Sequence, residues 1–355
     1  MQIAPTQLNL EIVPEARFDL IDVTKHIYKT HGDLLNRYKK SLYCSFHTTA
    51  GYLEESICEK FHHPQQVHPF ISTFRKLFPP EANYRHDQLQ LRTELSEEQR
   101  RIEPKNADSH LIFISSGMKN CVTYNNKPWR PVYFIDLDGV NGSAYRRRKT
   151  TVLAFNKEEA VHQTNMPIPV SRHPIDSINL KDTRQEFFEQ IRELVDRFDV
   201  QHGKIDIELA DDEKHAGLTV NEFETLLMKH DLAEVLHNPL KYMAIKGRHA
   251  LAEPFLIPGK TLDYAKYDLV QLFNKVMDTM GVSETIVERL LSIFLRVPAS
   301  HFLSVKRHIS LFVCENRFNG NGNIVFGRYQ SPILVQWKRA KGETRYVKIK
   351  ISKFG

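Results

Sequence analysis

The two halves of this sequence repeat the same ordered segments, and this constrains the fold more than any single element does. In the first half, residues Asn106–Leu111 lead into a strand-like run. In the second half, Pro298–Phe302 leads into a similar run, and His301 follows His110 at an offset of 191 positions. The pattern predicts two copies of one structural unit.

Two further pairs keep the same order. Trp129–Val132 is echoed by Tyr329–Pro332 at an offset of 200, and Ala50–Gly51 by Ala216–Gly217 at an offset of 166. The change of offset from 166 to 191 predicts a net insertion of 25 residues in the second copy, which we place in the helical pattern of residues 262–295. A chance match of three anchors is the alternative.

The composition is that of a globular protein, with 41% hydrophobic and 26% charged residues among 355. No stretch approaches the roughly 18 uncharged apolar residues that a membrane span needs. The start, Met1–Pro5, has no basic region followed by an apolar run, so we expect a cytoplasmic protein without a membrane partner. A net charge of +6 suits an anionic small ligand, but it is too dispersed for nucleic acid.

Helical and strand-like periodicities alternate along the chain. In the first half we expect helices over 22–38 and 64–78, and strands over 41–46, 131–136 and 147–155. In the second half we expect helices over 187–198, 270–277 and 287–294, a strand over 204–209, and strands at the end. Periodicity lapses over 166–177, where three prolines predict a linker between domains 1–165 and 178–355.

One group of polar residues in the first half is unusually rich in histidine and carboxylate. Its members are His47, His86, Asp87, Asn106, Asp108 and His110. Imidazoles and carboxylates from separate segments suit a divalent ion such as zinc or manganese, and they also suit phosphate positioning. The alternative is that these histidines are ordinary surface or core residues.

These residues fall in five ordered motifs. The motifs are His47–Ala50, Tyr84–Asp87, Asn106–Leu111, Trp129 ahead of a strand that ends at Asp138–Gly139, and Arg146–Arg148. The series resembles the YjbQ family, also called UPF0047, over about residues 8–156. The second half resembles a diverged second copy of the same unit.

The resemblance implies an α+β fold in each of two tandem units, with mixed β-sheets and packed helices. It also implies a homo-oligomer, usually a trimer, and one pocket of histidines and acids suited to a metal or an anion. Family members are labelled secondary thiamine-phosphate synthases, which join a pyrimidine diphosphate to a thiazole phosphate. This reaction is regarded as a side activity, and the principal reaction of the family is open.

The resemblance also assigns roles to residues. The catalytic residues would be His47, His86, Asp87, Asn106 and His110. The metal ligands would be His47, His86, Asp108 and His110, holding zinc, manganese or magnesium. The substrate-binding residues would be Thr48, Thr49, Trp129, Arg130, Arg146 and Arg148. Asp87 would orient His86 or act as a general base, and Arg146 or Arg148 would neutralise a phosphate leaving group. The alternative for the arginines is an exposed edge strand protected by charge.

This sequence departs from the family pattern in three places. Asp108 replaces a histidine, and Arg130 replaces a glutamine, which favours a more anionic ligand. The acidic run that follows the first histidine motif is absent from the first copy but is present in the second as Leu218–Glu224. We therefore hypothesise that the second half became a scaffold or contributes groups across an interface. The alternative is that Asn221 and Glu222 form a solvated turn.

Together these features predict an enzyme that acts on a small phosphorylated metabolite at a metal-binding pocket, with possible thiamine-phosphate synthase side activity. The alternatives are a metal-dependent phosphate-ester hydrolase and a non-enzymatic protein that binds a metabolite. His249 and His301 would be remnants of a second pocket.

Overall fold

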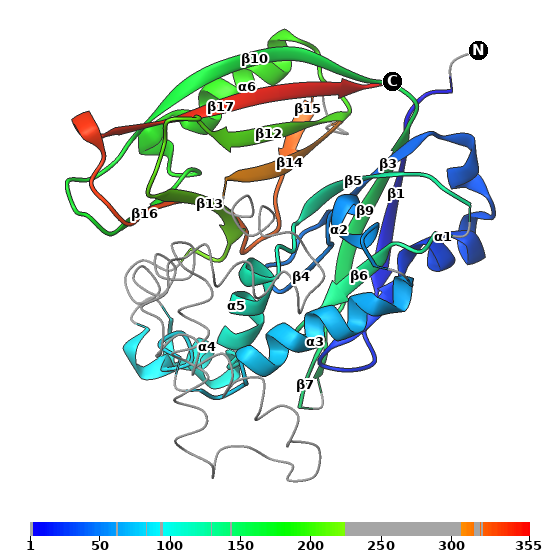
Figure 1. Ribbon diagram of the computed structural model, residues 1–355, viewed down its shortest axis with the longest axis horizontal. Helices are drawn as coiled ribbons and strands as arrows, with labels where there is room; N and C mark the ends of the chain where they lie inside the picture. The colour runs from blue at the N-terminus through cyan, green and yellow to red at the C-terminus, as the bar shows by residue number, and fades with distance from the viewer. Residues whose placement is uncertain are drawn as a thin grey trace.

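The computed structural model describes residues 3–223 and 307–355, apart from residues 62, 83, 93, 94, 129, 143, 316–319 and 321. It shows an α+β fold of antiparallel sheets with packed helices, as predicted (Figure 1). Several predicted features lie outside the described residues. These are Trp129, His249, His301, the insertion at 262–295, and the helices expected over 270–277 and 287–294. Within the described residues, no helix combines the length and apolar character that a membrane crossing requires.

The first half contains two main sheets. One has the order β1 (Thr6–Ile12), β9 (Arg148–Phe155), β3 (Lys40–Ser45) and β5 (Cys121–Asn125). The other has the order β2 (Asp19–Asp22), β6 (Tyr133–Asp136) and β4 (Ala50–Gly51). The helices are α1 (Val23–His31), α2 (Glu55–Cys58), α3 (Val67–Leu77), α4 (Glu97–Ile102) and α5 (Ala107–Ser115). A small hairpin pairs β7 (Val140–Asn141) with β8 (Ala144–Tyr145).

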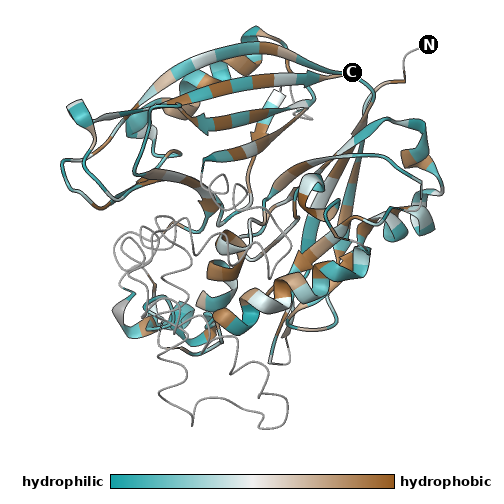
Figure 2. Cartoon of the chain, in the orientation of Figure 1, coloured by the Kyte–Doolittle hydropathy of each residue, from teal (hydrophilic) through white to brown (hydrophobic). Residues whose placement is uncertain are grey.

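The second half also contains two sheets. One has the order β10 (Glu158–Pro169), β17 (Thr344–Phe354), β12 (Gly203–Leu209), β14 (His308–Glu315) and β15 (Gly322–Val325). The other has the order β11 (Asp176–Asn179), β16 (Ser331–Gln336) and β13 (Ala216–Asn221). One helix, α6 (Phe187–Arg197), packs against the larger sheet. Figure 2 shows hydrophilic and hydrophobic residues alternating along β10, β17 and β12, which is the pattern of strands with one buried face.

The two halves have matching strand orders, except that the second half has the additional edge strand β15. The order β1–β9–β3–β5 corresponds to β10–β17–β12–β14, and β2–β6–β4 corresponds to β11–β16–β13. The correspondence extends to single residues, because Gly51 pairs with Ile135 just as Gly217 pairs with Val335. These pairs stand at the offsets of 166 and 200 positions seen in the sequence.

Most predicted elements form close to their expected bounds, but the helix expected over 22–38 is shorter. It begins after Asp22, whose side chain accepts a hydrogen bond from the backbone N–H of Lys25, and it ends at Gly32. Gly32 has a φ of 61°, a conformation that ends the helix and that glycine adopts without steric penalty. A single 3₁₀ turn over Leu34–Arg37 follows.

The predicted linker over 166–177 is wrong, because it begins inside a strand. Strand β10 runs to Pro169 and pairs with β17 from His162 to that residue without interruption, and Met166 and Ile168 are buried in the core of the second half. In the described part of the chain β10 is an edge strand, where a proline without an N–H group is tolerated. The boundary between the halves therefore lies at residues 156–157, not at 165–178.

The halves pack closely against each other. The rings of Phe155 and Phe354, which end β9 and β17, are stacked with centroids 3.9 Å apart. Gly327 approaches the first half so closely that a Cβ atom there would lie 1.8 Å from the carbonyl oxygen of Phe46. This tight packing allows residues of one half to reach a site in the other.

Candidate metal centre

Helix α5 brings the second half into contact with the predicted site. All nine of its residues are buried, so it has no solvent-facing side. Its apolar residues share a core cluster with Ile333 and Val335 of β16, in the other half of the chain. Figure 1 places α5 directly beside the end of β13. His110 therefore lies between the two halves, with 2% of its surface exposed.

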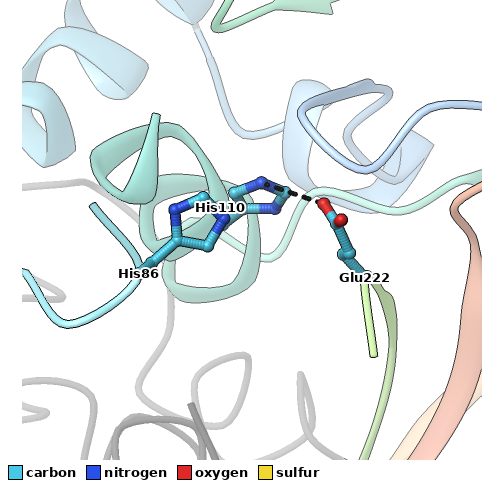
Figure 3. Close-up of side chains that lie close together, drawn as sticks. All are labelled: His86, His110 and Glu222. Atoms are coloured by element: carbon cyan, nitrogen blue, oxygen red, sulfur yellow. Dashed lines mark ion pairs between the residues drawn. The ribbon is translucent and has the colours of Figure 1, made fainter. Parts of the chain in front are cut away.

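Three side chains converge at this place. The ligand atoms of His86, His110 and Glu222 all lie within 4.8 Å of one another (Figure 3). His86 comes from the loop before the first-half helix α4, and Glu222 follows the last residue of β13 in the second half. The Nε2 atom of His110 lies 3.8 Å from Oε2 of Glu222. The group is therefore composite, with side chains from both halves.

Each imidazole is held through its Nδ1 atom. His86 Nδ1 lies 3.1 Å from Oδ1 of Asp87, which also accepts a hydrogen bond from the backbone N–H of Ala107 at the start of α5. His110 Nδ1 lies 2.8 Å from Oδ1 of Asn221. Burial, followed by the neighbouring His86, holds the pKa of His110 well below its usual range, so this imidazole is neutral. The contact to Asp87 provides the orientation predicted for His86, while its role as a general base stays a prediction.

Asn106 and Arg146 meet at a buried carboxylate beside this group. Asp138 accepts a hydrogen bond from Nδ2 of Asn106 at 2.6 Å and an ion pair from Arg146 at 2.8 Å. The side chain of Arg146 is 30% exposed, so its guanidinium can still meet a ligand from solvent. The positive charge of Arg146 also contributes to lowering the pKa of His110.

Buried atoms that lack a hydrogen-bond partner among the described residues are mostly acceptors here. They are Oδ2 of Asp87, Oδ1 of Asn106 and Nε2 of His110, with Nδ2 of Asn221 as the donor. Buried polar atoms without partners are rare in folded proteins, and a bound ion or water molecule commonly accounts for them. Because most of these atoms present lone pairs and not N–H or O–H groups, they favour binding of a cation over binding of an anion.

His47 is not part of this group, contrary to the ligand set predicted from the sequence. Its Nε2 atom accepts a hydrogen bond from the backbone N–H of Lys149 in β9, at 2.8 Å. Burial, followed by the charge of Arg148, lowers its pKa to about 3. In the second half, Glu213 accepts the corresponding hydrogen bond from Tyr346 in β17, also at 2.8 Å. This position therefore fastens a loop to a strand in both halves.

Asp108, another predicted ligand, also lies outside the group of described ligand atoms. Its Oδ1 atom pairs with Arg17 at 2.8 Å. Burial raises the pKa of Asp108 to about 6, although Arg17 acts in the opposite direction. Of the four predicted ligands, the structure thus brings together only His86 and His110.

Arg148 is buried and bonded to residues of the first half, and its predicted role in substrate binding stays a prediction. It donates to both carboxylate oxygens of Asp136, at 2.6 and 2.8 Å, and to the carbonyl oxygen of Asp138 at 2.8 Å. It also donates to Oγ1 of Thr49 at 3.3 Å, and the predicted role of Thr49 in substrate binding stays a prediction. The alternative of a charged edge strand is wrong, because β9 lies between β1 and β3. Thr48 is buried, and its role stays a prediction.

Arg130 lies away from the histidines. Its guanidinium pairs with Glu55 at 2.8 Å and Glu59 at 3.1 Å. It lines a cavity of about 690 Å³ beside α1, whose lining contains none of the three converging residues. The family resemblance predicted that Arg130 lies in the histidine pocket, but in this structure it lies at the cavity beside α1.

Sequence reasoning left Glu222 undecided and missed Arg92. The acidic run of the second copy was the signal for Glu222, but its contact with the first half is not visible in the sequence. Arg92 is 2% exposed and lies between Glu103 at 3.2 Å and Glu222 at 3.7 Å. Arg92 belongs to none of the five sequence motifs, so the residues around it gave no indication of its position beside Glu222.

Comparisons with known proteins find distant similarity to solved structures and no matching family or curated protein. No protein-family model matches the chain, and no curated protein is significantly similar to it. Among solved structures, the chain is similar to a YbjQ-like protein of unknown function from Sulfolobus solfataricus P2, with 14% identity, a TM-score of 0.27, and coverage of 56% of this chain and 99% of that one.

Two further solved structures are similar in the same way. One is a hypothetical protein from Aeropyrum pernix K1, with 13% identity, a TM-score of 0.27, and coverage of 54% of this chain and 98% of that one. The other is an uncharacterized conserved protein of the YjbQ/UPF0047 family from Clostridium acetobutylicum, with 13% identity, a TM-score of 0.26, and coverage of 53% and 98%. The similarity thus covers about half of this chain at low identity.

Proposed function

We propose that this chain is a divalent-metal-dependent enzyme that hydrolyses a small phosphate ester. The observation that carries the proposal is the convergence of His86, His110 and Glu222 within 4.8 Å. Two imidazoles and one carboxylate form a donor set that is typical of catalytic zinc sites, which keep a further position for water or substrate. The distance of 3.8 Å between His110 Nε2 and Glu222 Oε2 is within the about 4 Å that two ligands of one zinc ion can span.

The residues present fit a cation in a second respect. The Nε2 atom of His110 is buried without a hydrogen-bond partner in the described residues, and it lies 3.8 Å from Oε2 of Glu222. A divalent ion beside these two atoms would give Nε2 the partner that a buried polar atom needs. A bound divalent ion would supply Lewis-acid polarisation and charge neutralisation for a phosphoryl group.

The surrounding residues supply binding and orientation. Asp87 fixes the ring of His86, and a carboxylate next to a ligating imidazole also raises its basicity. Arg146 and Arg17 have side chains 30% and 36% exposed at the buried acids Asp138 and Asp108. Their guanidinium groups would bind the negative oxygens of a phosphate and hold it beside the metal ligands.

We also propose that the chain arose by tandem duplication of a YjbQ-like unit. The matching order of the strands other than β15 supports this proposal, and so do the corresponding hydrogen bonds of His47 and Glu213. The transfer reaction of a thiamine-phosphate synthase stays a prediction of the family resemblance, and no contact described here favours it over hydrolysis.

The first prediction is that Glu222→Gln binds zinc at least about tenfold more weakly than wild type, because a neutral amide replaces a charged ligand. Isothermal titration of the chelator-treated protein with zinc, manganese and magnesium measures this directly. Glu103→Gln is the matched control, because Glu103 contacts the other side of Arg92 and lies outside the histidine group. We expect it to retain wild-type affinity.

Turnover of p-nitrophenyl phosphate by the metal-loaded protein then tests hydrolysis. We expect wild type and Glu103→Gln to release phosphate and Glu222→Gln to be inactive. Equal zinc affinity in all three proteins would refute the metal site. Zinc binding without turnover of this or other phosphate esters would instead favour the non-enzymatic, metabolite-binding alternative.

A further inference from the structure

The side chain of Asn221 reaches His110 from the other half of the chain. Asn221 is the last residue of β13, where it pairs with Ser331 of β16, and 2% of its surface is exposed. Its Oδ1 atom lies 2.8 Å from Nδ1 of His110 and 2.7 Å from the backbone nitrogen of Glu222. One amide oxygen therefore meets two nitrogen atoms of the candidate metal centre.

These two contacts determine which way the amide faces. The backbone N–H of Glu222 can only donate a hydrogen bond, so the side-chain atom of Asn221 that meets it must be the oxygen. An amide oxygen can only accept, so Nδ1 of His110 must be the donor in the second contact. Asparagine flips and histidine tautomers are otherwise ambiguous, but here each contact fixes the next.

The position of the proton on Nδ1 has a consequence for the other ring nitrogen. A neutral imidazole carries one proton, so Nε2 of His110 is left with its lone pair. This atom is the one that lies 3.8 Å from Glu222 and that has no hydrogen-bond partner in the described part of the chain. A metal ligand needs this lone pair, and the opposite tautomer would place a proton there instead.

We infer that Asn221 is a positioning residue that holds the proton of His110 on Nδ1 and so keeps Nε2 ready to bind the metal. The inference rests on the proposed metal site for its functional meaning, but the tautomer itself is a property of the metal-free protein. It also gives the second half a specific task. The half that lacks the histidines supplies Glu222 and the acceptor that sets the protonation of His110.

The test measures the tautomer first. Long-range ¹H–¹⁵N NMR spectra of metal-free protein labelled on histidine nitrogen distinguish the two tautomers of a neutral ring. We expect His110 of wild type to carry its proton on Nδ1. Asn221→Asp keeps an oxygen for both contacts and should keep this tautomer, whereas Asn221→Leu removes the acceptor and should shift His110 towards the Nε2–H form.

Zinc titration gives the second measurement. We expect Asn221→Leu to bind zinc about 10–100-fold more weakly, which is the usual effect of removing a group that orients a metal ligand, and Asn221→Asp to remain within about threefold of wild type. Asn179→Leu is the matched control. Asn179 lies in β11 of the same sheet, and its Oδ1 atom accepts from the backbone N–H of Lys181 without contacting a histidine. It should change neither measurement.

The outcomes separate the two proposals. An Nε2–H tautomer in wild type overturns the inference even if Asn221→Leu does not fold, as does an unchanged tautomer in a folded Asn221→Leu. Loss of zinc affinity in Asn221→Asp equal to that in Asn221→Leu would also overturn it. If wild type shows the Nδ1–H tautomer but binds no zinc, the metal proposal fails while the effect of Asn221 on His110 stands.

Discussion

Arg148→Met is expected to lower the free energy of unfolding by about 3–5 kcal/mol, the usual cost of removing one partner of a buried ion pair. The side chain of Asp136 is fully buried, and Arg148 supplies hydrogen bonds to both of its oxygens. Methionine fills a similar volume but leaves this carboxylate without its counter-charge. Urea unfolding followed by circular dichroism measures the difference.

The neighbouring residue provides the control for Arg148. Arg147 is 76% exposed and pairs only with Glu11, which is 46% exposed, among the contacts described. A surface pair of this kind contributes at most about 1 kcal/mol, so Arg147→Met should be close to wild type. Similar stabilities for the two variants would show that the buried pair does not stabilise the first half.

The second large effect is a loss of stability in acid that originates at His47. Its pKa is lowered to about 3 in the folded protein, whereas an unfolded histidine has a pKa of about 6.5. The unfolded chain therefore binds more protons between these values, and stability is lost as the pH falls. Between pH 7 and pH 4.5 we expect this residue alone to contribute a loss of about 2.5 kcal/mol.

His47→Glu tests this prediction, because Glu213 occupies the corresponding place in the second half and pairs with Arg345 at 2.7 Å. A glutamate at 47 would accept from Lys149 and pair with Arg148, and because its unfolded pKa is about 4.3, the acid-dependent loss from this position down to pH 4.5 should fall to about 0.3 kcal/mol. His47→Ala also removes the titration, but it should cost about 1 kcal/mol at neutral pH through the lost hydrogen bond. Urea unfolding of each variant at both pH values gives these quantities.

The same variants bear on the ligand assignment. If His47 fastens a loop and does not bind metal, His47→Glu should retain the zinc affinity of wild type. A variant as acid-sensitive as wild type would contradict the pKa argument. A loss of zinc affinity in His47→Glu would restore His47 as a ligand.

Local patterns were sufficient for most of the fold. The alternation over 41–46, 147–155 and 204–209 predicted strands that form as β3, β9 and β12, because alternation reflects a buried face. The prediction of a linker was wrong because Pro167 and Pro169 can lie within a strand when that strand, here β10, is at the edge of a sheet. The edge position results from pairing with β17, which lies at the other end of the second half, so the sequence around the prolines does not reveal it.

The candidate site was only partly accessible to sequence reasoning for the same reason. Its motifs indicated that His86 and His110 meet, and the acidic run raised the possibility that the second half contributes. The hydrogen bond of His47 to Lys149 and the ion pair of Arg148 with Asp136 join separate segments. Histidine and arginine in a motif are equally compatible with binding a ligand and with holding strands together, so only the contacts decide.

The division of the metal centre between the halves has a consequence for how the protein is made. A ribosome delivers α5 with His110 long before it delivers Asn221 and Glu222, and domains generally begin to fold as they emerge. During that interval the apolar face of α5 that β16 later covers would be exposed to solvent and prone to aggregation. The nascent chain would also lack Asn221 and Glu222 at the candidate metal centre. Under the proposed function, the site would be complete only after the second half has been synthesised and has covered this face of α5.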